Sequence, residues 1–92
     1  MNKVIYKYPL DEVDRQTISM PKGAEILSLQ VQNGTPCIWA LVNKGADMED
    51  RTFVMIGTGH PIMDELYSGA EYIGTAIVFN DTLVWHVFEL TN

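Results

Sequence analysis

Two runs in which apolar and polar residues alternate flank Asn33-Gly34, and they predict the hairpin around which the chain folds. Asn and Gly both tolerate the positive φ angles of a type I′ turn, so this dipeptide is a strong signal for a two-residue hairpin loop. Because side chains alternate across a strand, one face of the hairpin is apolar and is expected to enter the core. That face carries Leu27, Leu29, Val31, Pro36, Ile38 and Ala40.

The opposite face of the same hairpin is polar, with a single large indole. It carries Ser28, Gln30, Gln32, Thr35, Cys37 and Trp39. Trp39 could stack a planar group while Gln30 and Gln32 hydrogen-bond its edge, or it could lie under a second sheet as part of the core. Pro36 has no N–H for a further strand, which predicts that its end of the strand is an edge.

Five further strands are expected from alternation and from the turns between them. They span residues 3–10, 15–20, 51–56, 72–79 and 82–90, and residues 63–67 could form one helical turn. The last two strands form a hairpin that is apolar on both faces, which requires a second sheet or another subunit to cover it. About six to seven short strands predict an all-β fold, a small antiparallel β-sandwich or partly open barrel, in one domain over residues 1–92.

Composition and charge narrow the classes of function. The chain is 47% hydrophobic with a formal net charge of −6, so it is globular and general nucleic-acid binding is not expected. The acidic surface would serve solubility or dock a basic protein. We expect no membrane segment and a cytoplasmic location, because no apolar run has membrane-spanning length and no signal sequence is recognisable. The excess of apolar strand surface favours a homo-oligomer.

The segment Gly57-Thr58-Gly59-His60-Pro61 is the most specific candidate for a binding site. Its glycines would let the backbone approach a ligand, successive N–H groups could bind an anion, and His60 would add a donor that can be protonated. The spacing matches neither a P-loop nor a dinucleotide fingerprint, and a tight turn at a strand end explains the same residues. Arg15 and Arg51 are the only guanidinium groups, and either would suit a phosphate or carboxylate if it faced a pocket.

His86 lies in an apolar run opposite Thr75, and a half-buried, hydrogen-bonded histidine is the simplest interpretation. His60 and His86 could form a metal or hydrolase site with Glu89 or Cys37, although no local ligand spacing supports it. Neither the cysteine nor the serines have a nucleophile motif. We therefore expect no catalytic residue, no metal and no cofactor.

Several longer motifs extend over nearly the whole chain. They are YKYPL (6–10), DRQ (14–16), MPKGA (20–24), VQNGTPCIWALV (31–42), GTGHP (57–61), YIGT (72–75) and WHVFE (85–89). By these motifs the chain resembles a family of small bacteriophage and prophage proteins of unknown function. The resemblance implies an accessory phage protein in the bacterial host cytoplasm, and such proteins often bind and block a host-defence component or its nucleotide messenger.

We therefore expect a non-enzymatic binding protein that sequesters a small ligand, such as a nucleotide messenger, or a host factor. The candidate ligand-binding residues are Gly57, Thr58, Gly59, His60, Trp39, Gln30, Gln32, Arg15 and His86. An acidic protein–protein inhibitor of a basic host protein is the first alternative, and a small metal-dependent hydrolase is the second.

Overall fold

The structure is a computed structural model that describes residues 2–91, apart from the side chains of residues 65 and 67. In this part of the chain lie seven strands and one short helix: β1 (Lys3–Pro9), β2 (Arg15–Pro21), β3 (Glu25–Gln32), β4 (Thr35–Asn43), β5 (Met48–Gly57), α1 (Asp64–Ser68), β6 (Ala70–Val78) and β7 (Leu83–Leu90). The predicted helical turn is α1. No described helix has the length and apolar composition needed to cross a bilayer.

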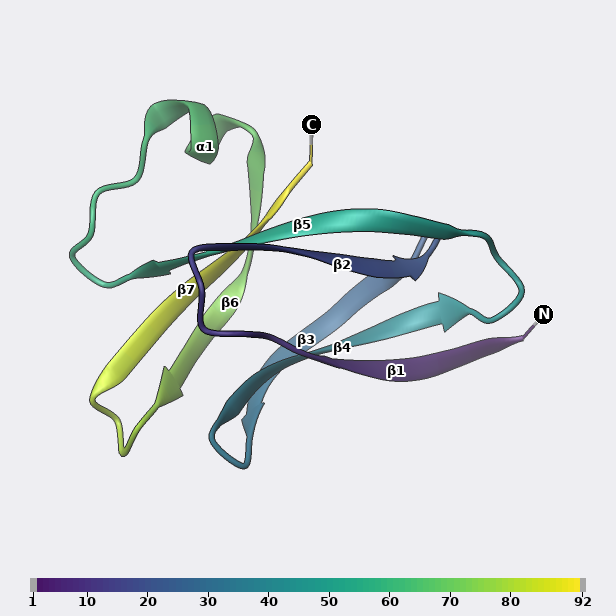
Figure 1. The fold of residues 1–92 in the computed structure, drawn as a ribbon, viewed down its shortest axis with the longest axis horizontal. Coiled ribbons are helices and arrows are strands. Elements are labelled where there is room, and N and C mark those ends of the chain that lie inside the picture. Colours follow the sequence, from purple (N-terminus) through teal and green to yellow (C-terminus); the bar gives the residue numbers. More distant parts are fainter. Residues whose placement is uncertain (1, 92) are drawn as a thin grey trace.

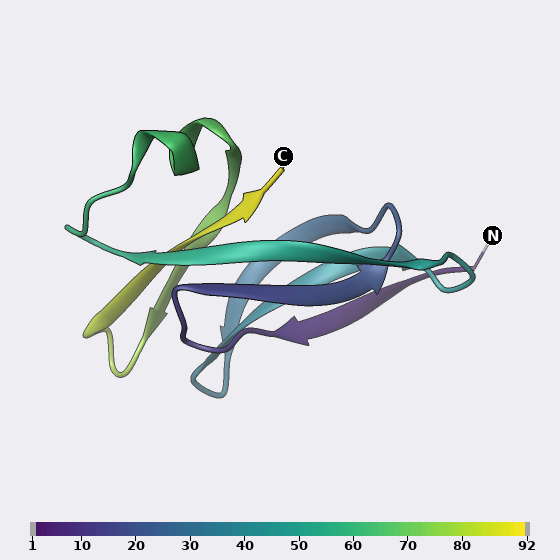
Figure 2. The ribbon, with the colours of Figure 1, turned by 45° about the horizontal axis from the view of Figure 1, so that its top comes forward.

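The strands form two antiparallel sheets, as predicted for a sandwich or a partly open barrel. Sheet A has the order β1-β4-β3 and sheet B the order β2-β5-β7-β6 (Figure 1). The chain enters sheet B at β2 directly after leaving β1, and Figures 1 and 2 show these two strands running along the same side of the molecule. They are the outer strands of different sheets, so the barrel is not closed.

The predicted β3–β4 register is confirmed from the turn as far as the Ser28–Trp39 pair. Asn33 and Gly34 both have positive φ angles, 51° and 77°, as their turn requires. Beyond Ser28 a β-bulge shifts the pairing, so that Ala40 faces Ile26. The expectation that Leu27 enters the core is therefore wrong, because the bulge turns its side chain out and leaves it 45% exposed.

Two further expectations for this hairpin are corrected by the sheet order. Val31 is exposed because it lies beside the turn, beyond the cover of sheet B. Pro36 is buried and is not at an edge, because β4 is the central strand of sheet A. The pairing of β1 with β4 ends at the Pro9–Cys37 pair, so Pro36, which has no N–H, lies just beyond the last pair. The Pro36 carbonyl accepts the N–H of Leu10 at 2.8 Å.

The two sheets pack through one apolar core. Its fully buried residues include Met20, Ile38, Ala40, Phe53 and Val87. The predicted β6–β7 register is confirmed from the turn as far as the Gly74–Val87 pair, with Thr75 opposite His86, and a β-bulge between Tyr72 and Gly74 shifts it beyond that point. At Gly74 sheet B approaches β3 so closely that an added Cβ would lie 3.3 Å from Leu29, which explains a glycine at that point.

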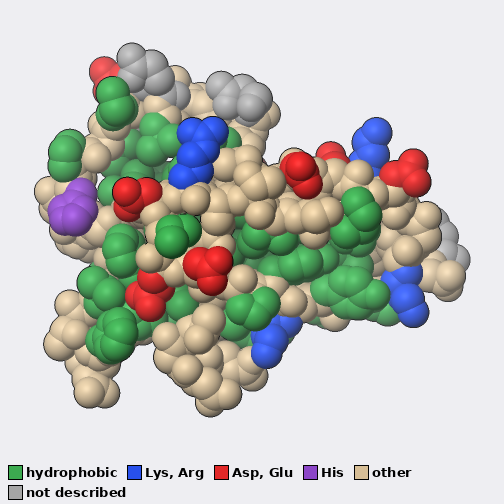
Figure 3. Space-filling view, in the orientation of Figure 1, with side chains coloured by type: hydrophobic (Ala, Val, Ile, Leu, Met, Phe, Trp, Pro, Cys, Tyr) green, Lys and Arg blue, Asp and Glu red, His purple; other side chains and the backbone are tan. Residues whose placement is uncertain are grey.

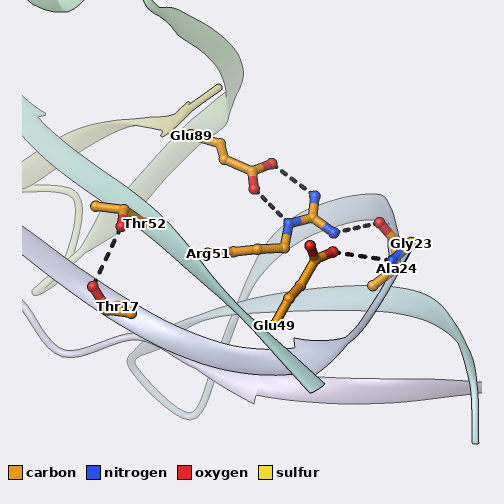
Figure 4. Close-up of polar contacts among 7 residues, drawn as sticks. All are labelled: Thr17, Gly23, Ala24, Glu49, Arg51, Thr52 and Glu89. Atoms are coloured by element: carbon orange, nitrogen blue, oxygen red, sulfur yellow. Dashed lines mark hydrogen bonds and ion pairs between the residues drawn. The ribbon is translucent and has the colours of Figure 1, made fainter. Parts of the chain in front are cut away.

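An ion pair fastens sheet B to the chain segment that enters sheet A. Arg51 on β5 donates from Nε and Nη2 to the Glu89 carboxylate on β7, at 2.5 and 2.8 Å. Its Nη1 donates to the carbonyl of Ala24, in the turn between β2 and β3 (Figure 4). Glu49 accepts the N–H of Gly23 in the same turn at 3.0 Å. Glu89 is only 6% exposed, so its charge needs this partner.

The bulge can be tested with two leucines two positions apart. Leu29→Ala should lower the free energy of unfolding by about 2–4 kcal/mol because it empties a core site. Leu27→Ala should lower it by less than about 1 kcal/mol because that side chain faces solvent. Urea unfolding of both variants measures this, and equal losses would show that β3 has no bulge.

Candidate functional site

A cavity of about 760 Å³ lies on the outer face of sheet B, beneath the segment that leads from β5 into α1. Its apolar walls include Val54, Ile56, Pro61, Met63, Leu66 and Leu90, and its polar groups are Asp14, Arg15 and His60. Figure 3 shows this region as hydrophobic surface bordered by basic, acidic and histidine side chains. Alternation along the strands explains why these residues line the cavity. Arg15 pairs with Val54, and Ile56 pairs with His86, so their side chains lie on the same outer face of sheet B.

Arg15 is the guanidinium group that remains available at this cavity. It lies at the start of β2 and is exposed, and its side chain has no hydrogen-bond or ion-pair partner among the described side chains. Arg51, in contrast, is fully engaged with Glu89 and Ala24. The hydrogen bond that Arg51 donates to Glu89 is the main reason that the pKa of Arg51 is raised above its usual value, against an opposing contribution from burial.

The predicted Gly57–Pro61 segment is a tight turn that places His60 at the cavity. The His60 N–H donates to the Gly57 carbonyl at 3.1 Å, which closes the turn. The imidazole lies over Gly57, where an added Cβ would come within 3.2 Å of Nδ1. Gly59 has a φ of +87°. Both glycines thus have a structural reason, and His60 is the side chain that the turn presents to the cavity.

His86 belongs to a chain of hydroxyl and imidazole groups beside this turn. Thr58 Oγ1 lies 2.7 Å from His86 Nε2, and Thr75 Oγ1 lies 3.0 Å from Nδ1. The hydroxyl of Tyr72 continues the chain at 2.5 Å from Thr75 Oγ1. Both ring nitrogens of this half-buried histidine therefore have a partner, and one of these partners is Thr58 at the start of the turn.

The remaining predicted residues lie on a different face. Trp39, Gln30 and Gln32 are on the outer face of sheet A, because their neighbours along the strands point into the core. Trp39 is therefore not covered by sheet B, and Gln32 accepts a hydrogen bond from Lys7 at 2.8 Å. The structure thus divides the predicted site residues between two opposite faces of the sandwich.

The residues of the hydrolase alternative do not come together. Glu89 lies on the core face of β7 with Arg51, whereas His86 lies on the outer face. Within the described chain no three His, Cys, Asp or Glu side chains are placed to share a metal ion. Cys37 is buried, and its thiol lies 3.4 Å from the carbonyl of Thr35.

Sequence reasoning missed the apolar walls of the cavity. Val54 and Ile56 belong to a strand that was predicted. Because they alternate with Phe53 and Met55, which face the core, their side chains must lie on the outer face. Met63 and Leu66, just before and within α1, are apolar and three positions apart. No short-range signal places them over β5.

The fold and the cavity define a small antiparallel β-sandwich with a candidate ligand site on the outer face of one sheet. Over residues 1–92 the chain matches the family model of a domain of unknown function, DUF7352, and it belongs to this family. Comparisons with curated proteins and with solved structures found no match.

Removing the imidazole of His86 tests its role in holding the turn. His86→Ala should lower the free energy of unfolding by about 1–2 kcal/mol, because two side-chain hydrogen bonds are lost. Amide hydrogen exchange at Gly57 to His60 should become faster. His60→Ala is the control and should change stability by no more than about 0.5 kcal/mol. Unchanged exchange in His86→Ala would show that the turn is held by other contacts.

Proposed function

We propose that this protein is a non-catalytic binding protein that holds a small molecule with an apolar body and one acidic group. The observation that carries the proposal is the unpartnered guanidinium of Arg15 at the rim of an apolar cavity of about 760 Å³. Pockets for small ligands have volumes of about 300–1,000 Å³, apolar walls and a few convergent polar groups. The cavity has all three features.

The polar groups favour a particular ligand chemistry. A guanidinium binds a carboxylate or phosphate through two parallel hydrogen bonds, and His60 adds a second donor on the same cavity. Asp14 lies beside them and would repel a second negative charge. A single acidic group is therefore preferred over a polyphosphate. A cyclic mononucleotide meets this charge requirement with its one phosphate, and the face of its planar base suits the apolar wall.

The biological setting is part of the same proposal. The sequence motifs support a phage-encoded accessory protein that acts in the bacterial cytoplasm and sequesters a nucleotide messenger or another host factor. A homo-oligomer is supported by exposed apolar side chains on the β6–β7 hairpin, where Ile77 is 50% and Phe79 is 66% exposed. An oligomer would cover the second apolar face of that hairpin.

Titration calorimetry with defined probes tests the ligand site. The probes are cyclic mononucleotides and medium-chain fatty acids, with inorganic phosphate as the fragment control. At least one probe should bind, and Arg15→Ala should weaken it about 10- to 100-fold, because a hydrogen bond to a charged group is lost. Gln30→Ala, on the outer face of sheet A, should leave affinity unchanged.

Two results would contradict the proposal. One is the absence of binding by every probe together with a native mass spectrum, from bacterially expressed protein, that shows no added small mass. The other is equal affinity of wild type and Arg15→Ala. Binding to a basic protein that weakens steeply with salt would instead favour the acidic-inhibitor alternative.

A further inference from the structure

The side of the sandwich between β1 and β2 is open, and we call it the open side. Each of these strands is hydrogen-bonded to one neighbour only, β1 to β4 and β2 to β5. They follow each other in the chain and run along the same side of the molecule in both ribbon views. Two free strand edges, one from each sheet, therefore border the open side.

The floor of the open side is apolar. Val4, Tyr6 and Tyr8 alternate along the core face of β1, and Ile18 lies on the core face of β2. Tyr6 is 41% exposed, although Ala40, its partner in the ladder, is fully buried. Figure 3 shows hydrophobic surface between the two strands. The core thus reaches the surface here with no covering segment from the described chain.

The charges at the open side differ from those of the rest of the molecule. β1 contains Lys3 and Lys7, and neither β1 nor β2 contains an acidic residue, in a chain with a net charge of −6. The Lys7 ammonium also donates to Gln32 on the outer face of sheet A, and the one basic residue of β2, Arg15, lies at the cavity. Every other strand of the described chain has at least as many acidic as basic residues. Lysines on free edges discourage pairing with a second copy, which would bring the same positive strands together.

We propose that the open side binds an extended segment of a partner protein in which apolar and acidic residues alternate. The segment adds as a strand to a free edge, and its backbone pairs with the unpaired groups there. Because side chains alternate along a strand, its apolar residues cover Tyr6, Tyr8 and Ile18 while its acidic residues face the solvent side near Lys3 and Lys7. This proposal does not depend on the cavity.

The connection between β1 and β2 also suggests the orientation of the segment. Asp11, Glu12 and Asp14 lie at the end of the open side where β1 turns toward β2. Glu12 is held there by the indole N–H of Trp85, at 2.8 Å. Like charges repel, so the most acidic end of the bound segment should lie at the Lys3 end of β1.

Selection from a random-peptide display library on the full chain tests this inference. Enriched peptides should alternate apolar and acidic residues, and their binding should weaken with salt. On addition of such a peptide, backbone amide shifts should change in β1 and β2 and not around Arg15 and His60 of the cavity. Lys3→Gln/Lys7→Gln should weaken binding about tenfold, because two favourable surface charges are lost.

A matched double variant controls for net charge. Gln30→Glu/Asn80→Asp adds two negative charges, and Lys3→Gln/Lys7→Gln removes two positive ones, so both take the formal charge from −6 to −8. Only the lysine variant should lose affinity. Failure to enrich peptides, enrichment without acidic bias, equal loss in both variants, or shifts confined to the cavity would each overturn the inference. A dimer formed through β1 or β2 would also overturn it.

Discussion

The polar contact that links the two sheets is made by Arg51, which a bidentate ion pair with Glu89 holds in place. The ion pair joins β5 to β7, and a third hydrogen bond of Arg51 reaches the carbonyl of Ala24, where the chain crosses from sheet B to sheet A. A carboxylate that is 6% exposed would be costly without a cation, and a guanidinium is the side chain whose geometry satisfies a carboxylate and a carbonyl together. The pair thereby fixes the β2–β3 crossing, which Glu49 also holds through Gly23.

The two arginines consequently have different roles. The guanidinium of Arg51 is hydrogen-bonded within the fold, whereas that of Arg15 lies at the cavity with no partner among the described residues. The outer face of sheet B is where the structure gathers Arg15, His60 and an apolar wall, and the His86 chain holds the turn that presents His60. The open side between β1 and β2 uses a different part of the molecule, so a ligand in the cavity and a strand at the open side would not compete for the same residues.

Local patterns predicted much of the fold. Asn33-Gly34 set the β3–β4 register, and the alternation around it placed Trp39 and Gln30 on one face. The bulge at Leu27 was missed, although the alternation changes phase there. Ala24 and Ile26 are apolar before it, Leu27 and Leu29 after it, and Glu25 stands where an unbroken pattern would place an apolar residue. The cavity was predicted only in part. Arg15 and His60 were recognised by their chemistry. They lie at the same cavity because β2 pairs with β5 and because the segment from β5 to α1 folds back over sheet B, and no short-range pattern predicts either feature. For the same reason the sequence did not show that Trp39 and Gln30 lie on the opposite face of the sandwich from them.

A double-mutant cycle on the ion pair tests the role of Arg51 most directly. Urea unfolding of wild type, Arg51→Ala, Glu89→Ala and the double variant gives the coupling free energy between the two side chains. A buried pair that holds Arg51 in place for its hydrogen bond to Ala24 should give a coupling of about 2–3 kcal/mol, with each single variant strongly destabilised. A coupling below about 0.5 kcal/mol would place the pair among ordinary surface salt bridges. The junction between the two sheets would then be held mainly by apolar packing and by the Glu49–Gly23 hydrogen bond.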